Sequence, residues 1–239
     1  MPDAGHLSEA SLPHTTPAPA PYYPAPPWDL PNAQLIKVVY ETDVEAVLEW
    51  LPPKLTRSSP PYAIITVERY ADSPVGAFNA ATQYIGCRAG FFTRALALQT
   101  VVDSPVALAG LREIWGFPAQ PGEVQIEEQS DGVVVLVATQ AGNLLRLELR
   151  GAENIAPGLA RFDPVLTLRT APSLTEEARH DLLQMVQVDP EYEVTSAQRG
   201  RAEIELSGAW AVLPMRGVVA GTACEMNTEL PLARFVMPY

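Results

Sequence analysis

Two carboxylates beside arginines are the residues in this chain whose type and position best suit catalysis. Glu68 closes the apolar segment AIITV with Arg69 next to it, and Glu113 follows Arg112 near the expected end of a helix. A carboxyl group held close to a substrate can act as a general acid or base. An adjacent Arg–Glu pair is more often a surface ion pair, so neither pair identifies a catalytic site by itself.

The residues that other common mechanisms require are missing or dispersed. A serine or cysteine nucleophile needs a histidine within reach, but His180 is the single histidine after residue 14 and there is no Gly-x-Ser-x-Gly elbow. The chain contains neither a Gly-x-Gly-x-x-Gly fingerprint nor a Gly-Lys-Ser/Thr loop, so we expect no cofactor. His6, His14 and His180 form no ligand cluster and there is no Cys-x-x-Cys, which disfavours a zinc site.

Composition narrows the class of protein further. Of 239 residues, 47% are hydrophobic and 18% charged, which indicates a globular chain with a large core. The formal net charge of -12 disfavours nucleic acid and anionic membrane surfaces as partners. Lys37 and Lys54 are the only lysines, so any lysine chemistry has two candidates. Cys87 and Cys224 are too few for a disulfide scaffold, and we expect two reduced, buried thiols.

The expected location follows from segments that are missing. No apolar run of 18 residues exists that would cross a membrane. The N-terminus also lacks the basic start and apolar core of a signal peptide. We therefore expect a cytoplasmic protein.

The chain divides into a tail and one domain. Residues 1–27 are rich in Pro and Ala and predict a flexible N-terminal tail, whose end is expected to lie against the body through Tyr22, Tyr23 and Trp28. Residues 28–239 are expected to form a single domain. Its strand signals are β-branched apolar runs over 33–41, 61–71, 123–129, 132–140, 143–150, 164–171, 200–210 and 215–230. The three runs between 123 and 150 have short Gly-containing connections, which predicts an antiparallel meander.

Helices are expected to be few. The segment 42–53 begins at Thr42 or Asp43 and ends at two prolines. A second helix, 105–115, has Asp103 or Ser104 as its N-cap and Pro105 in its first turn. A third is predicted over 173–187, with a capping-box pattern at its start. Many strands with few helices predict an α+β fold of mostly antiparallel sheet, closed or half-closed into a barrel around a cavity.

A rigid turn follows the second helix. Gly116 is placed to end that helix, and Phe117–Gly122 forms a proline-rich loop with the inert pair Ala119–Gln120 at its centre. Together with the stretches VVYETDVEAVLEWLPPKL (38–55) and VERYADSPVGAFNAATQYIG (67–86), the stretch ALAGLREIWGFPAQ (107–120) resembles the acetoacetate decarboxylase family. This resemblance covers nearly everything after residue 30. It implies a β-rich cone or double barrel enclosing a pocket, and a homo-oligomer.

The same resemblance implies that the family's chemistry has changed. The family's catalytic lysine forms an imine with the substrate, and that position matches Ala119 here, with Gln120 at the second lysine that often follows. The glutamate of its Gly-x-Tyr-x-Glu turn falls at Ala80, and an arginine before the first strand at Ala33. The Arg112–Glu113 pair is retained. Three replacements at one pocket argue against acetoacetate decarboxylation.

The expected function is therefore a non-decarboxylating lyase, isomerase or cyclase. The resemblance implies a fairly apolar small-molecule substrate and a role in a natural-product pathway. Two alternatives remain: a non-catalytic small-molecule binder, and an imine-forming enzyme whose nucleophile has moved to Lys37. The candidate catalytic residues are Glu68, Arg112 and Glu113; the candidate substrate-binding residues are Tyr84, Phe78, Trp115, Phe117, Ala119, Gln120 and Lys37.

Overall fold

The computed structural model describes residues 12, 15–17, 20–176 and 178–239. Its strands are Trp28–Glu41 (β1), Thr56–Arg57 (β2), Tyr62–Tyr70 (β3), Phe78–Ala89 (β4), Phe92–Val102 (β5), Ala119–Pro121 (β6), Glu123–Gln129 (β7), Gly132–Thr139 (β8), Gly142–Ile155 (β9), Val165–Pro172 (β10), His180–Val188 (β11), Glu191–Leu206 (β12), Gly217–Leu230 (β13) and Phe235–Pro238 (β14). Within these described residues the α-helices are Val44–Trp50 (α1) and Pro105–Glu113 (α2), and Pro157–Leu159 (η2) and Gly208–Val212 (η3) are short 3₁₀ turns. The α+β class with mostly β structure is confirmed.

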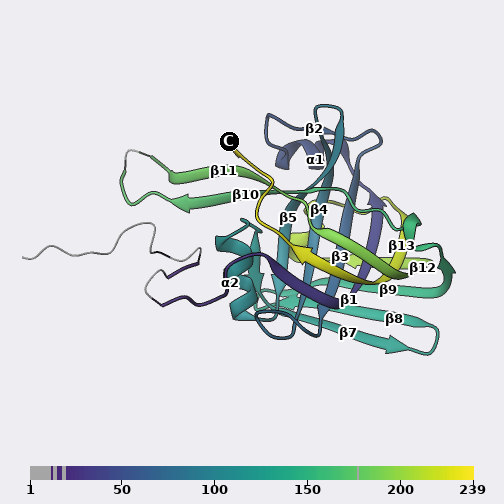
Figure 1. Cartoon of the computed structure of the whole chain (residues 1–239). Helices are drawn as coiled ribbons and strands as arrows, with labels where there is room; N and C mark the ends of the chain where they lie inside the picture. The colour runs from purple at the N-terminus through teal and green to yellow at the C-terminus, as the bar shows by residue number, and fades with distance from the viewer. Residues whose placement is uncertain (1–11, 13–14, 18–19, 177) are drawn as a thin grey trace, which may run out of the picture.

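The strands form one large, strongly curled sheet (Figure 1). Its order runs β14-β11-β10-β5-β4-β3-β1-β13-β12-β9-β8-β7, with β2 beside β4 and β6 beside β5. The pairing is antiparallel except for β10 with β5 and β5 with β6. The path is open, so the sheet is not closed into a barrel, and of the two expected forms, closed or half-closed, the closed one is wrong. At one end β7 exposes Glu123 and Glu127, and charges on an edge strand oppose further pairing.

Both faces of the central strands are buried. On one face Val38, Ile65 and Val67 belong to a core completed by β8, β9 and β12. On the other face α2 covers a second cluster that includes Trp28 and Trp115. Because these strands are buried on two sides, they read in sequence as continuous apolar runs and not as alternating ones.

The local predictions for the second helix are confirmed. Ser104 is its N-cap and accepts a hydrogen bond from the Ala107 amide. Gly116 has φ +75°, and a Cβ there would lie 2.7 Å from the Arg169 Cα, so this turn requires glycine. The meander between 123 and 150 is also confirmed as β7, β8 and β9.

The helix predicted over 173–187 is wrong. The segment instead leaves β10, turns, and returns as β11, so that His180 begins a strand; this hairpin extends from the body in Figure 1. The Ser173 hydroxyl, expected to cap the helix, accepts a hydrogen bond from the Thr175 amide within the turn. Met185 and Val186 are both buried because the strand is covered on both faces, and such a run resembles a helix in sequence.

The N-terminal segment is described only in part. Most of the predicted tail, including His6 and His14, lies outside the described residues, and the division at residue 27 stays a prediction. Tyr22 is half exposed, whereas Tyr23 is buried against the body. Both cysteines are buried and free, as expected. Among the described residues no helix is long and apolar enough to cross a membrane.

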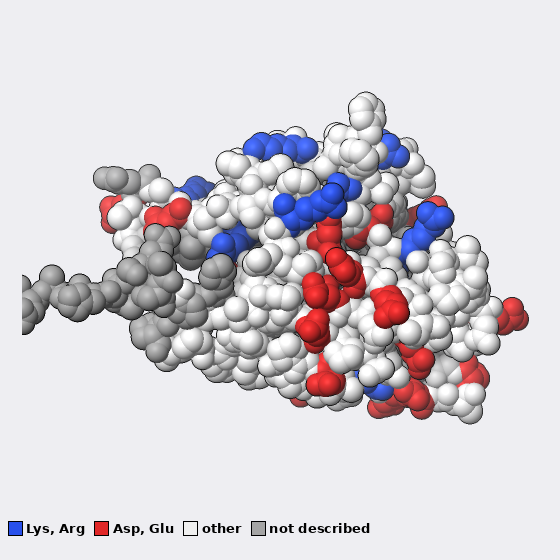
Figure 2. All heavy atoms as spheres, in the orientation of Figure 1, with Lys and Arg blue, Asp and Glu red and all other residues white. Residues whose placement is uncertain are grey.

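Charge is unevenly spread over the surface. Figure 2 shows acidic side chains gathered in a band down the middle of one face, with basic side chains mainly above it. The band agrees with the formal net charge of -12. This face therefore presents a negative potential to approaching ligands.

Candidate functional site

Glu68 lines a small cavity between the sheet and α2. Alternation along β3 turns Thr66, Glu68 and Tyr70 to this face, while Ile65 and Val67 enter the opposite core. The cavity holds about 50 Å³, enough for a few water molecules. Its walls come from seven strands, from the residues around α2 and from one loop: Trp28, Leu30, Glu68, Tyr70, Phe78, Ala80, Thr82, Tyr84, Thr100, Leu111, Phe117, Val165, Pro190, Tyr192, Thr228 and Leu230.

The environment of Glu68 favours its protonated form. Burial among apolar and aromatic groups raises the pKa of its carboxyl to about 7, and the nearby Thr66 hydroxyl opposes that rise. Glu68 retains some accessible surface because it lines the cavity. The Thr66 hydroxyl is itself buried and lacks a well-aligned hydrogen-bond partner among the described residues. A carboxyl with a pKa near neutrality can both take and return a proton at physiological pH.

Three tyrosines surround the same space. Burial is the main cause that raises the pKa of both Tyr70 and Tyr84, and the negative charge of Glu68 is the second cause. Burial is also the main cause that raises the pKa of Tyr192, and the negative charges of ionised Tyr84 and Glu68 add to it in that order. All three phenols therefore stay protonated and can donate hydrogen bonds into the cavity. Tyr70 packs on Phe78, with ring centroids 4.7 Å apart.

Of the residues expected from sequence, Glu68, Tyr84, Phe78 and Phe117 meet at this cavity. Sequence reasoning missed Trp28, Tyr70 and Tyr192. The two-residue spacing of Glu68 and Tyr70 on one strand was a signal that could have found Tyr70. Tyr192 comes from β12, far away in sequence, and no local pattern connects it to Glu68.

Arg112 and Glu113 line a different depression, of about 600 Å³, at the surface. The Glu113 carboxylate accepts hydrogen bonds from the Tyr23 hydroxyl, at 2.6 Å, and from Thr16. The Arg112 side chain is exposed. Two of the three expected catalytic residues thus lie outside the Glu68 cavity.

Ala119 lies between the two spaces. It is 6% exposed, lines the outer depression and belongs to the apolar cluster around the inner cavity. Its parallel pairing with Thr100 turns both side chains to the same face of the sheet, and Thr100 lines the cavity. Gln120 therefore points to the opposite face and is half-buried.

Trp115 is part of the core. Its side chain is fully buried and meets Trp28 edge-on, with ring centroids 4.9 Å apart at 81°. The indole nitrogen donates a hydrogen bond to the Pro231 carbonyl at 2.6 Å. Trp28, and not Trp115, is among the residues that line the cavity.

Lys37 occupies a third pocket, of about 230 Å³, with Arg199 and Cys224. Its ammonium donates to the Arg161 carbonyl at 2.6 Å and lies 5.3 Å from the centre of the Phe162 ring. Burial lowers the pKa of Lys37, and the negative charge of Asp163 opposes this. Phe162 stacks on Tyr192, with ring centroids 4.3 Å apart. Lys37 lies against Phe162 and Tyr192 lines the Glu68 cavity, so this aromatic pair stands between the amine and the cavity.

No metal site is formed by side chains that the structure describes. Groups of three or more His, Cys, Asp or Glu able to hold an ion are missing from that part of the chain. The described polar side chains at the Glu68 cavity are the Glu68 carboxyl, three tyrosine phenols and threonine hydroxyls. The last include Thr82, whose hydroxyl donates to Thr100 at 3.1 Å.

A comparison with protein families identifies the relationship of this chain to known proteins. The model described as "Acetoacetate decarboxylase (ADC)" matches residues 11–239. The chain belongs to the acetoacetate decarboxylase family. The resemblance drawn from the three sequence stretches is confirmed.

Curated relatives in this family are distant. An acetoacetate decarboxylase of Chromobacterium violaceum is 27% identical over 124 residues, 52% of this chain and 49% of the relative. The chain thus matches about half the length of this relative and of acetoacetate decarboxylase 1 of Bradyrhizobium diazoefficiens, of which 48% is covered. Acetoacetate decarboxylase 1 of Mesorhizobium japonicum is 24% identical over 247 residues, 92% of each chain.

Solved structures of the family share the fold. An acetoacetate decarboxylase has a TM-score of 0.88 at 18% identity, covering 98% of this chain and 99% of that one. An acetoacetate decarboxylase-like enzyme from Sphingomonas wittichii RW1 gives 0.81 at 17% identity, covering 95% and 100%. The enduracididine biosynthesis enzyme MppR, complexed with pyruvate, gives 0.77 at 14% identity, covering 94% and 97%.

Proposed function

We propose that this protein is an enzyme that moves protons on a small carbonyl compound in the Glu68 cavity, without a covalent intermediate. The observation that carries the proposal is the placement of Glu68 in a cavity of aromatic and apolar side chains, with its pKa raised to about 7. A carboxyl tuned in this way is typical of a general acid or base that works near neutral pH. The proposed reaction class is isomerase or lyase.

The step itself is a proton abstraction beside a carbonyl. The Glu68 carboxylate takes a proton from the α-carbon, and the electron pair of that C–H bond forms the C=C bond of an enolate. The enolate oxygen carries the resulting negative charge and accepts a hydrogen bond from a tyrosine hydroxyl, for which Tyr84 and Tyr70 are suited. Return of the proton to the same carbon restores the substrate, and return to another carbon isomerises it.

An imine at the cavity is disfavoured. No lysine is among the described residues that line it, and the pair Ala119–Gln120 supplies no amine. That Ala119 stands at the position of the family's lysine stays a prediction. MppR is a biosynthesis enzyme with this fold, which supports a biosynthetic role for a non-decarboxylating member. The cavity volume of about 50 Å³ favours a substrate of a few heavy atoms over a polyketide-sized one.

Hydrogen–deuterium exchange tests the proposal without knowledge of the natural substrate. Small ketones and aldehydes are incubated with the protein in D₂O at pH 8, and loss of the α-proton signals is followed by NMR. We expect at least one compound to exchange faster than in buffer alone, by tenfold or more. If none of a broad panel exchanges but one binds, the protein is a non-catalytic binder.

An imine-forming Lys37 is a second candidate, favoured by its lowered pKa. Borohydride reduction in the presence of the same carbonyl compounds separates it from the first. We expect no adduct, because the Lys37 ammonium is engaged by Arg161 and lies outside the Glu68 cavity. The exposed Lys54 is an internal control for non-specific labelling. A mass increase confined to the peptide with Lys37 would favour the second candidate.

Assembly and location stay predictions. We propose a homo-oligomer in the cytoplasm. The exposed apolar residues Phe235 and Val236 on the edge strand β14 support self-association, because open apolar edges readily pair.

A further inference from the structure

No described residue that lines the Glu68 cavity carries a positive charge to hold an anion. Among the sixteen described residues that line it, Glu68 is the single charged side chain. We infer that the substrate is an electrically neutral carbonyl compound, and that carboxylates are excluded; this rests on the proposed function of the cavity. The polar groups left to recognise it are the tyrosine and threonine hydroxyls.

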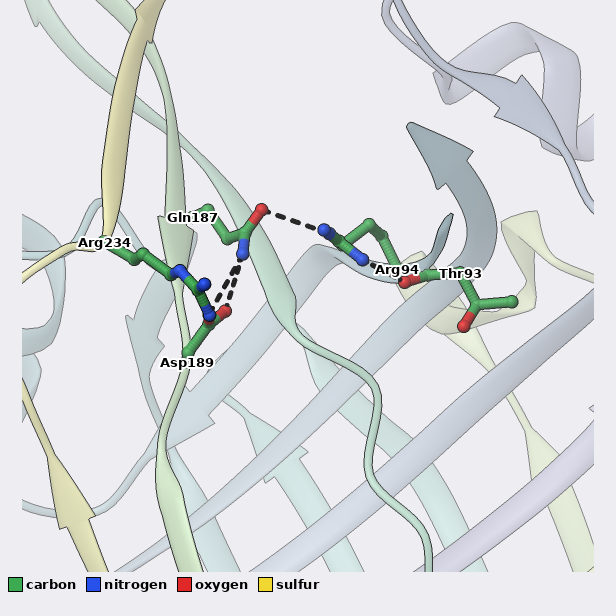
Figure 3. Close-up of polar contacts among 5 residues, drawn as sticks. All are labelled: Thr93, Arg94, Gln187, Asp189 and Arg234. Atoms are coloured by element: carbon green, nitrogen blue, oxygen red, sulfur yellow. Dashed lines mark hydrogen bonds and ion pairs between the residues drawn. The ribbon is translucent and has the colours of Figure 1, made fainter. Parts of the chain in front are cut away.

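Two arginines, Arg94 of β5 and Arg234 in the segment before β14, are held by polar contacts with Gln187 and Asp189 (Figure 3). Arg94 of β5 donates to Gln187, which in turn donates to Asp189, and Arg234 donates to Asp189 at 2.8 Å. The Gln187 side chain lies on one face of β11, and the Val188 side chain lies on the other face. Val188 belongs to the apolar cluster around the cavity. These contacts join β5, β11 and the segment before β14, and neither arginine is among the described residues that line the cavity.

Two further cations, Arg69 and Lys37, are also engaged away from the cavity. Arg69 follows Glu68 and therefore points to the opposite face of β3, where it donates to the Ile126 carbonyl at 2.8 Å and pairs with Glu128. Lys37 is bound to Arg161 behind the Phe162–Tyr192 pair. None of these described cations lines the cavity.

An anionic substrate would meet two electrostatic costs. Its carboxylate would lose water without gaining a cation, and an unpaired buried charge is strongly unfavourable. It would also lie beside the Glu68 carboxylate, which must be ionised to act as a base. The net charge of -12 and the acidic band in Figure 2 add a weaker repulsion outside the cavity.

A neutral carbonyl avoids both costs and uses what the cavity offers. Its oxygen can accept a hydrogen bond from Tyr70, Tyr84 or Tyr192, whose phenols remain protonated. Its carbon chain contacts Leu30, Phe117 and the other apolar walls. Recognition by neutral donors and apolar contact is typical of pockets for uncharged ligands.

A pair of isosteric probes tests the inference. Pyruvate and pyruvamide share a ketone with exchangeable methyl protons and differ chiefly in the charge of the carboxylate or amide group. Binding is measured by saturation-transfer NMR and by tryptophan fluorescence, since Trp28 lines the cavity, and exchange by NMR in D₂O. At pH 8 we expect pyruvamide to bind at least tenfold more tightly than pyruvate.

Charge removal supplies the matched controls. In Glu68→Gln we expect the preference for pyruvamide to shrink severalfold, because the repelling carboxylate is gone. In Glu128→Gln, which removes an equal charge from the surface, it should not change. Lowering the pH to 6 should also shrink the wild-type preference, because the tyrosines and threonines around Glu68 stay neutral and this carboxyl becomes protonated.

The outcomes separate this inference from the proposed function. Selective binding of pyruvamide without exchange would support neutral recognition and contradict proton-transfer catalysis. Exchange of both probes at similar rates would support catalysis and overturn the neutral-substrate inference. Equal or tighter binding of pyruvate, or binding of neither probe, would also overturn the inference.

Discussion

Glu68→Gln is expected to slow α-proton exchange about 10²–10⁴-fold at pH 8. The amide keeps the size and hydrogen-bonding shape of the side chain but cannot take the proton. Exchange rates are compared by NMR in D₂O for wild type and variant with the best carbonyl compound of the panel. Wild-type activity should rise with pH around 7, where the carboxyl ionises. Glu128→Gln serves as the control and should retain wild-type activity, because its carboxylate lies on the surface beside Arg69.

The same variant should be more stable than the wild type at high pH. Burial raises the pKa of Glu68 from 4.5 to about 7, so the folded state binds this proton more tightly than the unfolded chain does. This tighter proton binding stabilises the folded wild-type protein fully below pH 4.5, and the contribution is lost as the pH rises through about 7. At about 1.4 kcal/mol per pKa unit, the ionised carboxylate destabilises the fold by on the order of 3 kcal/mol.

Urea unfolding at pH 5 and pH 8 measures this effect. We expect the difference in free energy of unfolding between Glu68→Gln and wild type to become more favourable to the variant as pH rises. A difference that is equal at both pH values would contradict the burial of the Glu68 carboxyl. Loss of exchange together with a gain in stability would indicate that the chain retains a costly buried acid for its function.

Trp115→Ala should lower the free energy of unfolding by about 3–5 kcal/mol. The substitution removes a fully buried indole, its edge-on contact with Trp28 and its hydrogen bond to the Pro231 carbonyl. Urea unfolding followed by circular dichroism measures the change. Trp115→Phe should lose less, because it keeps most of the packing volume.

Trp50→Ala provides a matched control on α1. Its side chain is 43% exposed, so we expect a loss within about 1 kcal/mol. Comparable losses for the alanine variants of Trp50 and Trp115 would mean that Trp115 is not a core residue. This result would return it to the candidate ligand-binding residues.

Local features of this protein were predictable because they depend on neighbouring residues. The Ser104 cap, the Pro105 start and the Gly116 stop of α2 each depend on the backbone within one turn: Ser104 accepts from a free amide, Pro105 has a fixed φ, and Gly116 adopts a positive φ. The hairpins between 123 and 150 follow from alternation and short glycine turns. The segment 173–187 was predicted incorrectly because Met185 and Val186 are buried in apolar clusters on opposite faces of β11. The apolar run therefore does not alternate as a half-buried strand would, and residues distant in sequence supply the two clusters.

The amino-acid sequence by itself determined which chemistry is available. It holds two lysines, no histidine suited to a nucleophile, and a glutamate closing an apolar strand whose alternation puts Glu68 and Tyr70 on one face. Only the tertiary structure decided which groups meet: it brings Tyr192 to Glu68, holds Glu113 against Tyr23 and places Lys37 behind Phe162. Burial, which raises the pKa of Glu68, is a property of the packed surroundings and not of the residue or its neighbours in the chain.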